Sequence, residues 1–192
     1  MSSGTLHRLS AFTDTPDGGN PAGVWVGEAL PDPEEMQSIA CAVGFSETAF
    51  VAPTTGFDRT IRYYSPTTEI SFCGHATIAT GVMLGKTNGD GTYQLATMVG
   101  MVPVTVHHRD GRYQASLTSV EPMHKSAPEL VVSSILETLG WTQRDLDLTI
   151  PPAQAYAGAW HLVLAVTAQH RLNTLKYDFE RLKMLMLQAN LT

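Results

Sequence analysis

The sequence is poor in cysteine, in basic residues and in long apolar runs. Its 192 residues include two cysteines, Cys41 and Cys73, which are too few for a disulfide framework or for a zinc site made of cysteines alone. Lysine and arginine number 12 against 18 acidic residues, giving a net charge of −6, so a broad nucleic-acid interface is excluded. No apolar run reaches the roughly 18 residues of a membrane-spanning helix, and we expect no membrane partner.

The first residues, Met1 to Gly4, also lack the apolar core of a signal peptide, and we therefore expect a cytoplasmic protein. Hydrophobic residues make up 43% of the chain, charged residues 16% and aromatic residues 8%. This composition is typical of a globular chain with a core and excludes a disordered or collagen-like one. The length leaves room for one large domain or two small ones.

Short strand-like runs separated by turn signals fill the first 120 residues. Asp32, Pro33 and Gly44 are the cap and first-turn signals of a helix over 33–43, and the small residues of 74–85 predict a second helix packed deep among strands. Many antiparallel strands around few helices predict the α+β class. The expected strands are 6–12, 24–26, 48–52, 60–64, 93–99, 102–108 and 113–117.

The pattern changes after Glu121. Apolar residues recur at helical spacing over 127–139 and 179–187 and predict two helices. The segment 155–166 between them predicts a pair of strands bent at glycine. We therefore predict a first domain over residues 1–120 and a second, incomplete domain over 121–192.

Three short stretches hold candidate site residues. In the first, Gly18-Gly19-Asn20-Pro21, paired glycines allow close approach of the backbone to a ligand, and the Asn20 amide offers both a donor and an acceptor. An ordinary hairpin loop is the alternative interpretation, and it is the more common one for such a segment.

The second stretch is Ser46-Glu47-Thr48, where Glu47 enters a strand with apolar neighbours. Apolar surroundings disfavour the charged form of a carboxylate, which suits it to proton transfer near neutral pH. An exposed acid at a strand edge is the alternative.

The third stretch, Cys73-Gly74-His75, precedes and opens the expected helix over 74–85. Free N–H groups and the positive end of the helix dipole favour a bound carboxylate there. They also lower the pKa of a thiol, which would make Cys73 a reactive base. The alternatives are a buried core cysteine and a histidine bonded to the backbone. The other histidines lack metal-ligand spacing, so we expect no metal.

The segments AFTDTPDGGNPAGV, FSETAFV and IRYYSPTTEISFCGHATIATG, in this order, resemble the PhzF-like family of phenazine-biosynthesis isomerases. The resemblance is dense over residues 6–85 and looser beyond. It implies a fold related to diaminopimelate epimerase, with two similar halves. Each half is an antiparallel strand barrel around a central helix, here about 74–86, and the active site lies between the halves.

The resemblance also implies the roles of site residues. Glu47 matches the catalytic acid/base that moves a proton on a small carboxylated metabolite. The matching substrate-binding positions are Asn20, Ser46, Cys73, Gly74 and His75. Cofactors are not implied, and the expected partner is a second copy of the chain in a homodimer.

One family motif, of the form E-D-P-x-T-G-S/A, has no match in residues 150–192. We therefore expect a fragment, a truncated gene product, or one half of an assembly that a completing chain supplies, and we expect this chain to be inactive or weakly active alone. A non-catalytic remnant or interaction module is the alternative to an isomerase. A third hypothesis is a racemase that uses Cys73 as a base, as related epimerases use a cysteine at this position, although Cys41 does not match its opposed partner.

Overall fold

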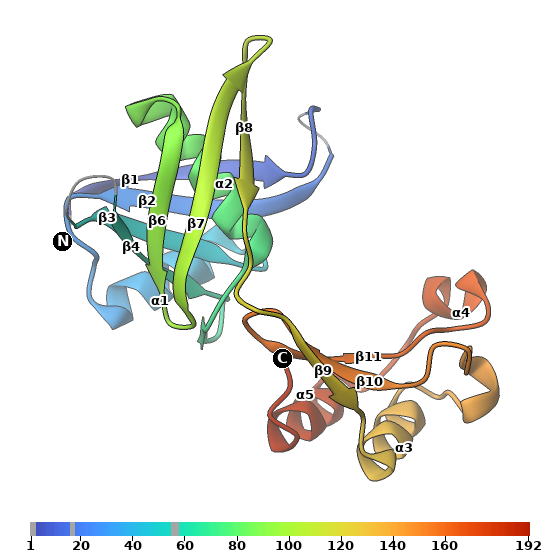
Figure 1. Cartoon of the computed structure of the whole chain (residues 1–192). Coiled ribbons are helices and arrows are strands. Elements are labelled where there is room, and N and C mark those ends of the chain that lie inside the picture. The colour runs from blue at the N-terminus through green and yellow to red at the C-terminus, as the bar shows by residue number, and fades with distance from the viewer. Residues whose placement is uncertain (1–2, 16–17, 55–57) are drawn as a thin grey trace. The chain divides into compact units, whose positions relative to one another are not determined.

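The computed structural model describes residues 3–15, 18–54 and 58–192 (Figure 1). By its internal contacts the chain divides into two compact units, Met1–Val120 and Glu121–Thr192. Parts of two predicted loops, at 16–17 and around Gly56, lie outside the described residues. Among the described residues, no helix has the length and apolar character needed to cross a membrane.

The first unit is a curled sheet wrapped around one helix (Figure 1). Its strands pair in the order β1-β2-β3-β4-β6-β7-β8, and β5 pairs with β4. The elements are β1 (Gly4–Ala11), β2 (Asn20–Gly27), α1 (Pro33–Val43), β3 (Thr48–Pro53), β4 (Arg59–Tyr64), β5 (Glu69–Ile70), α2 (Gly74–Asn88), β6 (Gly91–Thr97), β7 (Gly100–Arg109) and β8 (Arg112–Leu117).

The α+β class is confirmed, but the sheet is not wholly antiparallel. Strands β2 and β3 run parallel, as do β4 and β6. Each parallel pair is joined through a helix, α1 in the first case and α2 in the second, because a parallel connection needs a crossover that a tight turn cannot make.

Helix α1 begins and ends at the predicted caps. The Asp32 carboxylate accepts a hydrogen bond from the backbone N–H of Glu35 at 2.8 Å, and Gly44 ends the helix in the left-handed conformation with φ 72°. The Met36 and Ala40 side chains of α1 are fully buried. They pack in a cluster with Trp25 and Phe50 of the sheet.

Trp25 occupies a tight site in this cluster. A Cβ atom added to Gly4 or to Gly27 would lie about 2 Å from an atom of the indole. Both glycines are therefore required for the ring to lie against the backbone of β1 and β2, since a methyl group there would overlap it.

Helix α2 lies close against β7 because it carries glycine on that face. A Cβ atom added at Gly81 would lie 2.6 Å from a methyl group of Val104, and one added at Gly85 would lie 2.4 Å from a methyl group of Val106. The main core surrounds this helix and includes Ala76 and Leu84. The packing fixes the depth of α2, and with it the position of its first turn.

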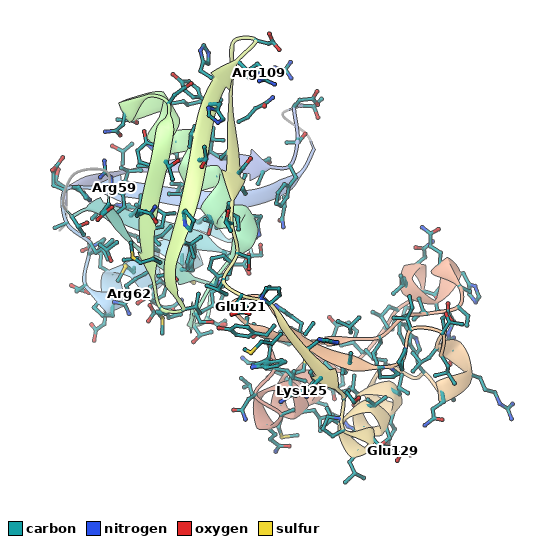
Figure 2. The ribbon with its side chains drawn as sticks, in the orientation of Figure 1. Arg59, Arg62, Arg109, Glu121, Lys125 and Glu129 are labelled. Atoms are coloured by element: carbon teal, nitrogen blue, oxygen red, sulfur yellow. The ribbon has the colours of Figure 1, made fainter. Side chains whose placement is uncertain are left out.

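The second unit, residues 121–192, contains a three-stranded antiparallel sheet ordered β11-β10-β9. The side chain of Lys125 on β9 is labelled in Figure 2. Its ammonium lies 4.5 Å from the centroid of the Trp160 ring on β11. The elements are β9 (Met123–Ser126), α3 (Glu129–Thr138), a 3-10 turn (Gln143–Asp145), β10 (Ala153–Tyr156), β11 (Trp160–Val163), α4 (Gln169–Asn173) and α5 (Phe179–Gln188).

Candidate active site

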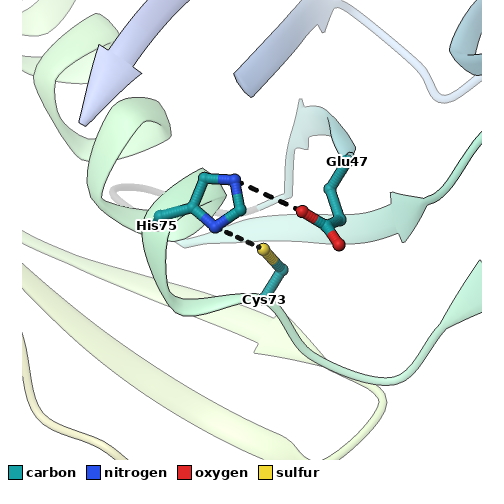
Figure 3. Close-up of side chains that lie close together, drawn as sticks. All are labelled: Glu47, Cys73 and His75. Atoms are coloured by element: carbon teal, nitrogen blue, oxygen red, sulfur yellow. Dashed lines mark hydrogen bonds and ion pairs between the residues drawn. The ribbon is translucent and has the colours of Figure 1, made fainter. Parts of the chain in front are cut away.

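Three of the predicted site residues converge at the first turn of α2 (Figure 3). Cys73 is the N-cap residue of this helix and His75 is in its first turn, while Glu47 directly precedes β3. Each residue has one nitrogen, sulfur or oxygen atom of its side chain within 4.8 Å of the corresponding atoms of the other two. The cluster therefore joins a carboxylate, a thiol and an imidazole from two segments 26 residues apart in the sequence.

The imidazole of His75 lies between the other two groups. Its Nε2 atom is 3.3 Å from Oε2 of Glu47, and its Nδ1 atom is 3.3 Å from Sγ of Cys73. The contact to Glu47 has the distance of an ion pair but not the geometry of a hydrogen bond. His75 Nε2 is buried and has no hydrogen-bond partner. Both of these His75 contacts are to side chains.

Exposure to solvent decreases from the carboxylate inwards. The side chain of Glu47 is 21% exposed and that of His75 is 11% exposed, while Cys73 is 7% exposed. A ligand from solvent therefore meets the Glu47 carboxylate first.

The expected low pKa of the Cys73 thiol is wrong. Burial, aided by the charge of Glu47, raises the pKa of this thiol from an ordinary value of 9.0 to about 12. The backbone N–H groups of Ala76 and His75 point at the sulfur and lower the pKa, as the position at a helix start predicts. The loss of hydration on burial outweighs them, so Cys73 is a protonated thiol at neutral pH.

Hydrogen bonds that sequence reasoning missed hold the start of α2 in place. The Thr77 hydroxyl donates to the carbonyl oxygen of Cys73 at 2.6 Å, and it accepts from the hydroxyl of Tyr63 on β4, also at 2.6 Å. Both side chains are buried. The signal was present in the sequence, because a threonine four residues after Cys73 is placed to bond back along a helix.

Glu47 is held through its backbone. Its carbonyl oxygen accepts a hydrogen bond from the N–H of Gly23 on β2 at 3.1 Å, and the next residue, Thr48, begins β3 and is fully buried. A Cβ atom added to Gly23 would lie 2.6 Å from the Thr48 hydroxyl oxygen. Glycine at this position therefore allows β2 to approach the segment that carries the carboxylate.

The remaining predicted site residues lie outside the three-residue cluster. Gly74 is the first residue of α2, between Cys73 and His75, and a Cβ atom there would meet nothing within 4 Å. Ser46, beside Glu47, is exposed, and Asn20 is an exposed residue at the start of β2. Their part in binding stays a prediction.

Two surface grooves of the first unit lie elsewhere. One, of about 830 Å³, is lined by Arg8, Lys86 and Arg112 among others, and the other, of about 870 Å³, runs beside α1 past Cys41 and Tyr64. Neither groove is lined by Glu47, Cys73 or His75. The cluster is thus identified by its chemistry and not by the size of a pocket.

Comparison with known proteins assigns the chain to a family. Residues 9–191 match the family model described as phenazine biosynthesis-like protein, PhzC-PhzF. The chain belongs to this family. Over 167 residues it is also 32% identical to the uncharacterized isomerase YfhB of Bacillus subtilis, an alignment that covers 85% of this chain and 57% of that protein.

A second relative of the PhzC-PhzF chain carries a named activity. The trans-2,3-dihydro-3-hydroxyanthranilate isomerase of Pseudomonas fluorescens is 27% identical over 179 residues, an alignment that covers 91% of this chain and 61% of that protein. The chain spans about three fifths of the length of the curated relatives it matches.

Solved structures agree with the family assignment. A PhzF-family phenazine biosynthesis protein of Bacillus anthracis matches with a TM-score of 0.73 and 28% identity, over 91% of this chain and 60% of that one. A predicted epimerase of Pseudomonas aeruginosa matches with a TM-score of 0.88 at 19% identity, over 99% of this chain and 68% of that one, which shows a shared fold.

Proposed function

We propose that this chain carries the proton-transfer residues of a cofactor-independent isomerase acting on a small carboxylated metabolite. The observation that carries the proposal is the Glu47 carboxylate, which lies 3.3 Å from the His75 imidazole at the first turn of α2. A carboxylate held by a neighbouring group and open to solvent on one side is a suitable general base.

In the proposed reaction, the Glu47 carboxylate removes a proton from a substrate carbon. The electron pair of the broken C–H bond moves into the conjugated system of the substrate, and the protonated Glu47 then returns the proton to a different carbon. Atoms and electrons balance within the substrate and one side chain, so the step needs no oxidant and no second base.

His75 and Cys73 have positioning roles in this proposal. Because the pKa of the Cys73 thiol is about 12, the thiol keeps its proton and donates it to Nδ1 of His75, 3.3 Å away. Neutral imidazole has one donor and one acceptor nitrogen, so Nε2, which lies 3.3 Å from Oε2 of Glu47, then carries the hydrogen. This arrangement places a polar hydrogen of His75 beside the carboxylate.

The substrate carboxylate is proposed to bind at the start of α2, beside Gly74. A helix N-terminus favours anions through its free N–H groups and its dipole, and the absence of a side chain at Gly74 leaves space there. The relative from Pseudomonas fluorescens is named as an isomerase of a hydroxyanthranilate, a class of carboxylated compound. Ser46 and Asn20 are proposed to line the same site.

The racemase hypothesis for Cys73 receives no support from the geometry. A thiol that is 7% exposed and protonated at neutral pH is a poor base, because the thiolate is the reactive form. The proposal of a homodimer, or of a completing chain, remains. A site completed by a second chain is consistent with the position of Glu47, Cys73 and His75, which line neither of the two grooves described above.

The test is isotope exchange in D2O. The protein is incubated with carboxylated candidate substrates, including trans-2,3-dihydro-3-hydroxyanthranilate, and mass spectrometry follows the incorporation of deuterium. Sedimentation reports the oligomeric state of the same samples.

We expect Glu47→Gln to lower exchange by about 10²–10⁴-fold, since an amide cannot take the proton. Glu28→Gln, at an exposed position, is the matched control and keeps the wild-type rate. Unchanged exchange in Glu47→Gln would contradict the assignment, and no exchange by any assembly of the wild type would favour the non-catalytic alternative.

A further inference from the structure

The cluster of Glu47, Cys73 and His75 has a property that the proposed proton transfer does not use. It presents one oxygen, one sulfur and one nitrogen donor, all within 4.8 Å of one another. Two of the separations are 3.3 Å, from His75 to Glu47 and from His75 to Cys73. We propose that these three side chains form a binding site for a soft divalent cation of the zinc class.

The distances fit such an ion. Zinc bonds of about 2.0–2.3 Å in tetrahedral geometry place neighbouring ligand atoms roughly 3.3–3.8 Å apart. The two contacts of His75 are already at this separation, and the remaining pair, the Cys73 sulfur and a Glu47 oxygen, needs to approach by no more than about 1.3 Å. Three protein ligands with a fourth position left to solvent is also the usual pattern of an open zinc site.

The donor set selects the class of metal. Magnesium and calcium prefer oxygen ligands, six or more in the case of calcium. Thiolate and imidazole ligands favour zinc and other soft or borderline cations. With one carboxylate among three donors, this cluster matches the second group.

Charge favours the ion as well. When the cation binds, the Cys73 proton leaves to solvent, so that a thiolate and the Glu47 carboxylate together carry two negative charges against the two positive charges of the metal. None of the ion pairs found among the described residues joins a lysine or arginine to any of the three. No neighbouring cation of that kind therefore competes for these donors.

The ligands are held before the ion arrives. The backbone of Cys73 and His75 is held at the start of α2, where Thr77 bonds to the Cys73 carbonyl, and the backbone of Glu47 is held by the hydrogen bond from Gly23. The partly exposed carboxylate gives the ion a way in. A bound cation would occupy the lone pair that the proposed base needs, so it would act as an inhibitor and not as a cofactor. Binding itself does not depend on the proposed function.

The experiment is a titration of the reduced full chain with Cd²⁺ alone, a spectroscopic substitute for zinc. Thiolate-to-cadmium charge transfer gives an ultraviolet band, and we expect it to saturate at one ion per chain, with Mg²⁺ giving none. Cys73→Ser loses the band. Cys41→Ser is the matched control, because Cys41 is the exposed cysteine, and it keeps the band. Glu47→Gln keeps the band but weakens affinity by more than about 10-fold, because loss of a ligand costs at least as much as loss of an outer partner that orients one.

Three results would overturn the proposal. The first is the absence of a saturable band in the wild type, and the second is a band that depends on Cys41 instead of Cys73. The third is unchanged affinity in both Glu47→Gln and His75→Asn, which would reduce the site to a single thiol. Circular dichroism of each variant checks folding beforehand. If Cys73→Ser does not fold, Glu47→Gln decides the matter, because its side chain is partly exposed.

Discussion

At the scale of single residues, the thiol of Cys73 shows how burial can reverse what a local motif predicts. The sequence places this cysteine at a helix start, where amides lower a thiol pKa, and the structure does show those amides. Sequence patterns do not report that Cys73 is also part of the main core. The choice between a reactive and a buried cysteine therefore required the fold.

The raised pKa of Cys73 predicts a pH-dependent stability. Above about pH 9 the unfolded chain loses the thiol proton, while the folded chain keeps it up to about 12. The unfolded state then binds fewer protons, so the free energy of unfolding falls as the pH rises through this window. Denaturant titrations at several alkaline pH values measure the slope.

Two variants isolate this effect from other alkaline titrations. Cys73→Ala is expected to remove its share of the slope, whereas Cys41→Ala, at an exposed position, keeps the wild-type slope. An identical slope in all three proteins would show that the folded thiol ionises in the ordinary range.

In the wild-type protein at pH 8, iodoacetamide is expected to modify Cys41 and to leave Cys73 unmodified until the chain unfolds.

At the scale of elements, predictions succeeded where a segment carried its own signal. Helix α1 has Asp32, Pro33 and Gly44 at its ends, and the structure uses Asp32 and Gly44 as its caps. Strand β9 was not predicted, because all four of its residues are exposed and show no alternation. It is a strand because it pairs with β10, which is a contact that local sequence does not specify.

Helix α2 offers a matched pair of glycine substitutions. Gly85→Ala places a methyl group 2.4 Å from Val106 and 2.9 Å from Tyr113, and we expect overpacking to lower the free energy of unfolding by about 1–3 kcal/mol. Gly74→Ala, on the same helix, meets nothing within 4 Å and is expected to be neutral or slightly stabilising, because alanine favours helix over glycine. Thermal or urea unfolding compares the two, and equal effects would show that α2 does not pack closely on β7.

At the scale of the whole molecule, the two units differ in how they are built. The first surrounds α2 with a sheet and contains a large connected core, while the second has a smaller apolar cluster around Val132, Leu136 and Trp141. The family resemblance and the α+β class were predictable from motif order and strand spacing. The parallel pairing of β2 with β3 was not, because it depends on where the crossover through α1 brings the chain.

We predict that residues 1–120 fold without the rest of the chain. This fragment contains the main core and every residue of the Glu47, Cys73 and His75 cluster. Expressed alone, it is expected to show a cooperative urea transition and the cadmium band of the full chain. A fragment that lacks a cooperative transition would show that residues 121–192 contribute to the stability of the first unit.

The placement of Trp25 has an optical consequence. The first unit contains this single tryptophan, almost fully buried against Phe50, whereas Trp141 and Trp160 both belong to the second unit. An indole removed from water emits at shorter wavelength, so replacing Trp141 and Trp160 with phenylalanine would leave a fluorophore that reports on the first unit alone. A red shift of its emission would then give the time at which that unit opens, separately from the second.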